Sequence, residues 1–534
     1  MSGMSGGRWR LSILGVATLL AAAITAAPAV GLTVAAIPSD FDGDGYADLA
    51  VGVPGEDVAS AGRHAGAVNV IYGSPTGLAA AGDQLWSQAS SGIKGSPHGR
   101  SNSADGRGDR FGEALASGDF DRDGFADLAV GVPQDRLPGT SRRIGSVNVL
   151  YGSPTGLTSA GDQLWSQANL PGTPELEDAF GAALAADDIN GDGYADLAIG
   201  VPGDDVGQWG NEGSVEIVYG GPNGLVATGA DVLTRVLTGA PDASAGLGVT
   251  VAVGDLDGDG FADVAGGAPH FGGGDISVFY ATSSGIDATR SQLVSQDSPG
   301  VPGTAEPRDG FGQALAIADF DGDGPADLAV GAPYETVVTD CEYADYCQNG
   351  AVIVLYGSDA GLTGQRDQLW HFDVPGVPGS VDPDPFDEDA FGWALAAGDV
   401  DGDDVADLAI GAPGTGPGTG SVVVLYGGGA GGLSTTGAQL WAQDSPGVPS
   451  TAEIFPQFGR SLAVADFDGS GERDLAIGAP FQHVGGPNPS GLVIVLYGSA
   501  VGATALDARG WTQDSPGIKD SAEQKDAFGW ALAS

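Results

Sequence analysis

One acidic segment, repeated seven times, constrains the fold of this 534-residue chain more than any other feature. The first copy reads DFDGDGYADLAVGVP from Asp40, and the others begin at Asp119, Asp188, Asp255, Asp319, Asp399 and Asp466. Phe-Gly pairs precede most copies, at Phe111, Phe180, Phe311, Phe391 and Phe458, with Leu247-Gly248 as a variant and Phe528-Gly529 as the last pair. Such a repeat indicates an array in which each unit buries its apolar surface against its neighbours.

Each unit is interpreted as four short strands. The Phe-Gly segment and an ADLAVG-type segment flank the acidic loop, and an AVNVIYG-type segment, an SPTGL-type turn and a tryptophan-bearing segment such as DQLWSQ follow. Short apolar or alternating runs bounded by Gly, Pro, Asn and Asp are typical of strands. Seven units of about 70 residues predict an all-β, seven-bladed β-propeller of four-stranded blades over residues 37–534. A linear β-solenoid is the alternative, but its repeat is normally shorter.

The two ends of the repeat array complement one another. The last Phe-Gly segment, FGWALAS (528–534), is not followed by an acidic loop, and the loop at Asp40 has no Phe-Gly segment before it. A propeller that does not close leaves strand edges exposed to other chains. We therefore expect these two pieces to share one blade, which places Asp40 near Ser534.

The motifs resemble those of a known family. Phe-Gly pairs alternate with Gly-Val-Pro in the first three copies and Gly-Ala-Pro at Gly267, Gly331, Gly411 and Gly478, on either side of a D-x-D-x-D-G loop. This arrangement resembles the FG-GAP repeat, which builds the N-terminal propeller of integrin α subunits and of related surface and secreted proteins. The resemblance covers essentially all of residues 37–534, and it implies a propeller that recognises a protein or glycan.

The acidic loops place oxygen atoms at a spacing suited to calcium. Carboxylates stand at positions 1, 3, 5 and 9, a glycine at position 6 permits the turn, and the carbonyl of position 7 can point inward. Ca²⁺ takes about six to eight oxygen ligands in flexible geometry, whereas Mg²⁺ fits such a loop less well. We predict up to seven Ca²⁺ ions. The predicted ligands are Asp40, Asp42, Asp44, Tyr46, Asp48; Asp119, Asp121, Asp123, Phe125, Asp127; Asp188, Asn190, Asp192, Tyr194, Asp196; Asp255, Asp257, Asp259, Phe261, Asp263; Asp319, Asp321, Asp323, Pro325, Asp327; Asp399, Asp401, Asp403, Val405, Asp407; Asp466, Asp468, Ser470, Glu472 and Asp474.

The seven loops are not equivalent. Asn190 keeps an oxygen at position 3 but removes a charge, and Asp404 replaces the position-6 glycine. The loop at Asp466 is expected to be the weakest, because Ser470 stands at position 5. An EF-hand would need a glutamate at position 12, where this chain has residues such as Val51 and Ile199. Solvated turns that bind nothing are the other alternative, but clustered carboxylates without a cation repel one another.

Charge and the N-terminal segment bear on location and partners. The chain has 70 acidic and 20 basic residues and a net charge of −50, which disfavours nucleic acid as a partner. Arg8 and Arg10 precede an apolar run with small-residue cleavage sites, so residues 1–36 are predicted to be a signal peptide of a secreted or surface protein. An uncleaved membrane anchor is the alternative. Cys341 and Cys347 are expected to form a local disulfide in an exported protein.

Other motifs are discounted as functional signals. The Arg-Gly-Asp tripeptide at 107–109 contains Asp109, which belongs to a D-x-F-G position repeated in other units. The G-x-S-x-G at 3–7 precedes the apolar run, and the five histidines lie on separate segments without a partner motif. Catalytic residues are therefore not predicted. The repeated tryptophans are interpreted as packing between blades rather than a sugar platform; they are Trp86, Trp165, Trp370, Trp441 and Trp511.

Two classes of function follow. The first is a calcium-binding recognition or adhesion module, not an enzyme, for an extracellular protein or glycan, with the loops at 55–66, 90–110, 334–350 and 373–389 as the variable surface. We expect a monomer without a membrane contact after signal cleavage. The alternative is an extracellular propeller enzyme that acts on polysaccharide or another polymer, which the fold alone does not exclude.

Overall fold

The computed structural model describes residues 39–58, 64–98, 108–136, 143–206, 210–235, 245–270, 272–337, 349–380, 389–450, 456–483 and 489–534. The predicted signal peptide (1–36) and the predicted Cys341–Cys347 disulfide lie outside these residues. Within the described ranges, no helix is long and apolar enough to cross a membrane. The helices that occur there are short: η1 (Gln167–Asn169), α1 (Thr415–Gly418) and η3 (Gly429–Gly431).

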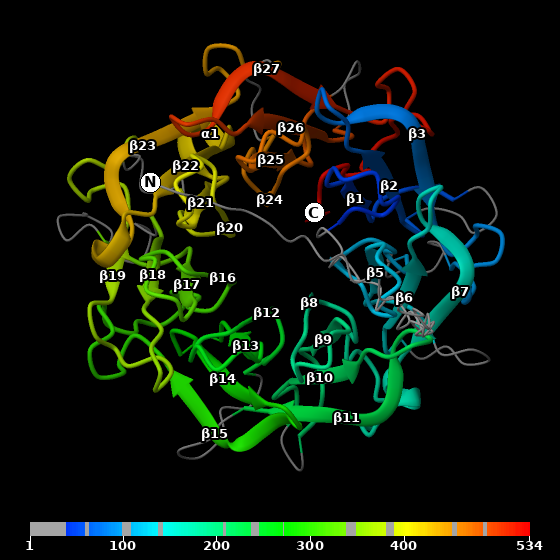
Figure 1. Ribbon diagram of the computed structural model, residues 1–534, viewed down its shortest axis with the longest axis horizontal. Coiled ribbons are helices and arrows are strands. Elements are labelled where there is room, and N and C mark those ends of the chain that lie inside the picture. The colour runs from blue at the N-terminus through cyan, green and yellow to red at the C-terminus, as the bar shows by residue number, and fades with distance from the viewer. Residues whose placement is uncertain are drawn as a thin grey trace, which may run out of the picture. The chain divides into compact units, whose positions relative to one another are not determined.

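Seven antiparallel four-stranded sheets form the blades of a β-propeller, which confirms the predicted fold (Figure 1). The first strands lie innermost: β4 (Leu115–Gly118), β8 (Leu184–Asp187), β12 (Thr250–Gly254), β16 (Ala314–Ala318), β20 (Ala394–Gly398), β24 (Ser461–Ala465) and β28 (Leu532–Ala533). The second strands are β1 (Leu49–Val53), β5 (Asp127–Val132), β9 (Asp196–Val201), β13 (Asp263–Ala268), β17 (Asp327–Ala332), β21 (Asp407–Ala412) and β25 (Asp474–Ala479). The third strands are β2 (Ala67–Tyr72), β6 (Ser146–Tyr151), β10 (Ser214–Tyr219), β14 (Asp275–Thr282), β18 (Ala351–Leu355), β22 (Ser421–Tyr426) and β26 (Leu492–Tyr497). The outer strands are β3 (Ala79–Trp86), β7 (Thr158–Trp165), β11 (Val226–Thr234), β15 (Gly285–Val294), β19 (Gln368–Trp370), β23 (Ser434–Ala442) and β27 (Thr504–Trp511).

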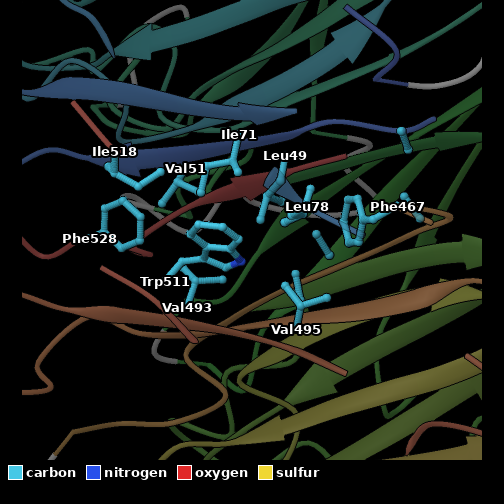
Figure 2. Close-up of a cluster of buried hydrophobic side chains, with 14 of the residues drawn as sticks. Leu49, Val51, Ile71, Leu78, Phe467, Val493, Val495, Trp511, Ile518 and Phe528 are labelled. Atoms are coloured by element: carbon cyan, nitrogen blue, oxygen red, sulfur yellow. The ribbon is translucent and has the colours of Figure 1, made fainter. Parts of the chain in front are cut away.

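The core lies between neighbouring blades. In one cluster, Val51 and Ile71 of the blade containing β1 pack against Val493 and Trp511 of the blade containing β26 and β27 (Figure 2). Each blade is covered on both faces in this way, which is why the second strands are apolar at consecutive positions rather than alternating. Trp511 is only 8% exposed, and Trp165 and Trp370 are equally buried in equivalent clusters. The prediction that the repeated tryptophans pack between blades is confirmed for these three.

The Phe-Gly and Gly-x-Pro motifs meet at the blade boundaries. The sequence interpretation placed each Phe-Gly pair in the inner strand, but Phe111 and Gly112 lie before β4, and Phe111 forms a parallel bridge with Gly66 of the preceding blade. Gly112 has a φ of +87°, and its carbonyl oxygen would lie 2.2 Å from a Cβ added at Gly52. Glycine is therefore required on both sides of this contact, because only glycine allows the two backbones to approach so closely.

The ring closes as the sequence predicted. Strand β28, at the C-terminal end of the chain, pairs antiparallel with β1, in the register Ala50–Ala533 and Val51–Leu532. The Phe528 side chain is fully buried in the cluster between this blade and its neighbour (Figure 2). The sheet order β28–β1–β2–β3 therefore assembles one blade from the two ends of the described chain.

Candidate metal sites in the acidic loops

Each acidic loop leads into the second strand of its blade, and we name it after its first aspartate. The Asp119 loop, for example, runs from the end of β4 to the start of β5 at Asp127. All blades have the same strand order, so all seven loops lie at the same end of the blades. The structure excludes an EF-hand, as sequence analysis expected, because Val51, Val130 and Ile199 at position 12 lie inside strands β1, β5 and β9.

Backbone hydrogen bonds hold the first and last carboxylates of every loop. In the Asp40 loop, Asp44 N–H donates to Asp40 Oδ1 (3.1 Å) and Gly45 N–H donates to Asp40 Oδ2 (2.9 Å). Phe41 N–H and Gly73 N–H donate to the two oxygens of Asp48, each at 2.8 Å. The same pairs of bonds recur in the other six loops. The chain's own backbone thus holds the first and last carboxylates of each loop in place.

The seven loops are linked to one another in a closed ring. The N–H of position 8 in each loop donates to the carbonyl oxygen of position 1 in the preceding loop. Ala126 N–H bonds to Asp40 O at 2.9 Å, and Ala47 N–H bonds to Asp466 O at 3.1 Å across the closure. The remaining five bonds are Ala195 to Asp119, Ala262 to Asp188, Ala326 to Asp255, Ala406 to Asp319 and Arg473 to Asp399. A shift in one loop therefore disturbs its neighbours on both sides.

Clustered carboxylates give these loops an unfavourable electrostatic environment. One carboxylate oxygen from each of Asp40, Asp42 and Asp48 lies within 4.8 Å of the others, and the Asp119 and Asp255 loops contain similar groups. Burial, followed by the charges of Asp42 and Asp40, raises the pKa of Asp48 to about 8 despite two hydrogen bonds that oppose the shift. Burial is also the largest cause in the Asp119 loop, where it raises the pKa of Asp121 to about 6 with the help of Asp123. A bound cation would oppose both effects, because a nearby positive charge favours the ionised carboxylate.

The donor set fits a hard divalent cation. Every donor in the loops is an oxygen atom, and carboxylates dominate. In the Asp399 loop, burial and the charges of Asp403 and Asp399 raise the pKa of Asp401. Asp401 stands at position 3, which sequence analysis predicted to be a ligand. The weaker donors Asn190 and Ser470 lie in loops with the same backbone hydrogen bonds, so these substitutions change the ligands but not the loop.

Two loops contain an arginine that sequence analysis did not identify. Arg290 Nη2 lies 2.5 Å from Asp257 Oδ2, and Arg366 Nη1 lies 2.6 Å from Asp321 Oδ2. Each arginine lies in the outer part of the blade that contains its carboxylate. Arg290 follows Asp257 by 33 residues, and Arg366 follows Asp321 by 45 residues. Their separation in sequence and the absence of an arginine at this position in most repeats explain why no local pattern revealed them.

A second feature missed by sequence analysis lies where the inner strands begin, at the other end of the blades. The Arg460 guanidinium lies 4.5 Å from the ring centre of Trp393 and 4.8 Å from that of Trp530. The Arg110 guanidinium lies 5.1 Å from the ring centre of Trp530, and Arg110 also forms an ion pair with Glu113. Burial lowers the pKa of Arg460. Each of these residues lies next to a Phe-Gly pair. The residue type there differs from one repeat to the next, and this variation is the signal from which sequence analysis could have identified them.

The variable loops lie at this same end, because strand direction alternates within each blade. Parts of them (59–63, 99–107, 338–348 and 381–388) fall outside the described residues. Arg107 of the Arg-Gly-Asp tripeptide is among these, but Asp109 is 1% exposed and accepts a hydrogen bond from the backbone N–H of His98. Asp109 thus has the internal position that its place in the repeat predicted.

The fold and loops define a class: a seven-bladed β-propeller with an oxygen-rich acidic loop in each blade. The chain belongs to the FG-GAP repeat family, which matches residues 33–71, 111–147, 180–219, 247–279, 311–355, 391–425 and 458–496. Each match contains one acidic loop together with the second strand that follows it, so the predicted family is confirmed.

Curated relatives match parts of the chain. It is 36% identical over 177 residues to phosphatidylinositol-glycan-specific phospholipase D of Mus musculus, which covers 32% of this chain and 20% of the relative. It is 35% identical over 162 residues to integrin alpha-7 of Rattus norvegicus (30% and 13%) and 34% identical over 237 residues to integrin alpha-5 of Xenopus laevis (42% and 20%). The chain thus spans a fifth or less of these relatives. A crystal structure of an exotype rhamnogalacturonan lyase aligns over 86% of this chain and 66% of its own length, at 12% identity. Its TM-score of 0.36 is too low to indicate a shared fold.

Proposed function

We propose that this chain is a secreted or cell-surface calcium-binding propeller that recognises an extracellular protein or glycan. The observation that carries the calcium assignment is the repeated loop geometry: carboxylates fixed by backbone N–H groups at positions 1 and 9, with further oxygens converging between them. Tyr46, Phe125 and the other position-7 residues would add their carbonyl oxygens as ligands.

Calcium would act chiefly on stability. At a site Kd of ~0.1 mM and free Ca²⁺ of ~1 mM, each occupied site contributes about 1.4 kcal/mol to the folded state. Because the loops are linked through position 8 and position 1, occupancy of one loop also supports its neighbours. The proposed role of calcium is therefore to hold the ring of loops together, while the opposite end of the blades binds the ligand.

Chelation tests the calcium assignment. We expect excess EGTA to lower the melting temperature by many degrees, and we expect added Ca²⁺ to restore it far better than Mg²⁺ at the same concentration. Thermal melts by circular dichroism, with the metal content measured on the same sample, provide the readout. An unchanged melt of protein shown to be free of metal would contradict the proposal.

The recognition surface is proposed to lie at the end of the blades opposite the acidic loops. Arg460, Trp393 and Trp530 lie at that end, a combination of aromatic rings and guanidinium that is common in binding surfaces. Family membership and the integrin relatives support a binding role for the chain. The phospholipase D relatives keep an enzymatic role as the second candidate, although the match covers 20% of that protein.

A ligand screen separates the two candidates. We expect a glycan array or a protein pull-down to yield a ligand in Ca²⁺ and not in EGTA, bound by a monomer as judged by size-exclusion chromatography. Trp393→Ala should weaken capture, whereas Leu506→Ala, which changes a 73% exposed side chain on β27, should not. Recovery of a chemically altered ligand would favour the enzyme, and equal capture by the Trp393 variant would exclude the proposed surface.

A further inference from the structure

In two of the acidic loops, an arginine from the outer part of the same blade contacts the carboxylates at positions 3 and 5. In the Asp255 loop, the Arg290 guanidinium contacts Asp257 at 2.5 Å and lies 4.0 Å from Asp259 Oδ2. In the Asp319 loop, the Arg366 guanidinium contacts Asp321 at 2.6 Å and Asp323 at 3.3 Å. Each guanidinium therefore spans the carboxylates at positions 3 and 5 of its loop. Position 3 is almost completely buried in both loops, at 2% and 0% exposed.

A tyrosine that recurs in every repeat of the chain supports each arginine. The Arg290 guanidinium lies 5.0 Å from the ring centre of Tyr280, and Arg366 lies 5.0 Å from that of Tyr356. This cation–π contact fixes the side chain over the loop. Asp257 and Asp321, together with the further charges of their loops, raise the pKa of both arginines, so each remains a cation.

The strand register shows that these arginines occupy one structural position. Gln292 pairs with Val278 and Gln368 with Val354, and Gln84 pairs with Val70 in the same way in the blade of β1. The residue two places before the outer-strand partner is an arginine only in the blades of β15 and β19, where it is Arg290 and Arg366. The corresponding residues in the other five blades are Gly82, Gly161, Gly229, Gly437 and Asp507.

The glycines at this position explain why the arginines are informative. Gly82 and Gly161 have φ values of +91° and +87°, and Arg366 adopts the same left-handed region at +65°. This conformation is unfavourable for a side chain other than glycine, and at Arg366 surrounding contacts compensate for it. Arg290 does not share it, because its φ is not positive, and Asp507 adopts it at +60°. Glycine leaves the loop open to a metal ion, whereas arginine extends a cation into it.

We infer that the Asp255 and Asp319 loops are neutralised by Arg290 and Arg366 in place of calcium, so that the chain binds calcium in the other five loops. This inference rests on the proposed calcium function and specifies which loops carry it. A divalent ion about 5 Å from a fixed unit charge is repelled enough, even with the screening of water, to weaken binding more than tenfold. The guanidinium also occupies the carboxylate oxygens that the metal would need. The five expected sites are the loops at Asp40, Asp119, Asp188, Asp399 and Asp466.

Calcium stoichiometry of the full chain tests the inference. Equilibrium dialysis against a series of buffered Ca²⁺ concentrations, followed by metal analysis, should find that the wild type binds calcium in five of its seven loops. The double variant Arg290→Gly, Arg366→Gly installs the residue found in four other blades, and it should bind two additional ions. Occupancy of all seven loops by the wild type, unchanged in the double variant, would overturn the inference and leave the calcium function intact.

A matched pair of variants provides an independent test if the double variant does not fold. Asp42→Asn and Asp257→Asn remove the position-3 charge from a loop without an arginine and from the loop in which Arg290 contacts Asp257. We expect Asp42→Asn to lose one calcium ion, or to weaken one site at least tenfold, while Asp257→Asn leaves the stoichiometry and the other affinities unchanged. Equal loss in both folded variants would overturn the inference, and a wild type that binds no calcium would instead overturn the proposed function.

Discussion

Replacement of Phe528 by alanine tests how the ring is closed. The Phe528 side chain is 0% exposed and packs with Val51, Val493 and Ile518 between the blade that contains β28 and β1 and the blade that contains β24 to β27 (Figure 2). Truncation of a fully buried phenylalanine to alanine costs about 3–5 kcal/mol. A cooperative unit of roughly 500 residues has an unfolding entropy of about 1 kcal/mol/K, so Phe528→Ala should lower the melting temperature by about 3–5 °C.

Differential scanning calorimetry in saturating Ca²⁺ provides the measurement, with two controls. Phe458→Ala changes the equivalent, fully buried residue at a boundary inside the ring and should produce the same decrease. Leu506→Ala changes a 73% exposed side chain and should leave the melt within about 1 °C. A melt of Phe528→Ala equal to that of the wild type, beside a normal decrease for Phe458→Ala, would refute closure through this strand.

Removal of the whole segment should be worse than the point change. Deletion of residues 528–534 also removes β28, which exposes the edge of β1. It removes the hydrogen bond from Gly52 N–H to Ala531 O as well. An unpaired edge is a template for pairing with another chain. We expect light scattering to show concentration-dependent association of the deleted protein, which Phe528→Ala does not show.

Two further predictions concern the blade boundaries and the buried acids. Gly131→Ala should destabilise the fold by about 1–3 kcal/mol or more, because its Cβ would lie 2.2 Å from the carbonyl oxygen of Gly181; Gly431→Ala, with no atom within 4 Å of the added Cβ, should be neutral in the same urea titration. With the loops saturated by Ca²⁺, stability should fall as the pH rises from about 4 to about 8, since burial raises the pKa of Asp109 to about 8 and of Glu216 and Asp526 to about 7. Their folded-state pKa values exceed those of the unfolded chain, so the native state holds more protons in this range and loses that advantage as they ionise; a melting temperature that rises steadily over this range would contradict the assignment.

The repeat made most of the fold predictable. Seven similar segments must adopt similar conformations, and the alternation of strands and turns within one segment is local information. The donor spacing of a loop such as 40–48 is equally local, because the covalent chain fixes which atoms can converge on one point. The offset ends, FGWALAS at 528–534 and the loop at Asp40, were sufficient to predict the pairing of β28 with β1.

Contacts between repeats required the tertiary structure. The hydrogen bond from Ala47 to Asp466 joins residues from opposite parts of the chain, and the approach of Gly52 to Gly112 exists only once two blades stack. The same holds for Arg460, whose two tryptophans come from the neighbouring blades. No spacing in the sequence encodes these distances, since they depend on the twist and packing of whole sheets.

The sequence by itself determined the number of blades, the strands in each, the closure and the potential metal ligands, because all of these follow from the repeated unit. Only the tertiary structure decided that the loops form one hydrogen-bonded ring, and that Arg290 and Arg366 enter two of them. A side chain on an outer strand reaches an acidic loop only after the blade has formed and the strand register has placed it there. The difference between a loop left open for a cation and one that contains its own is therefore a property of the folded blade.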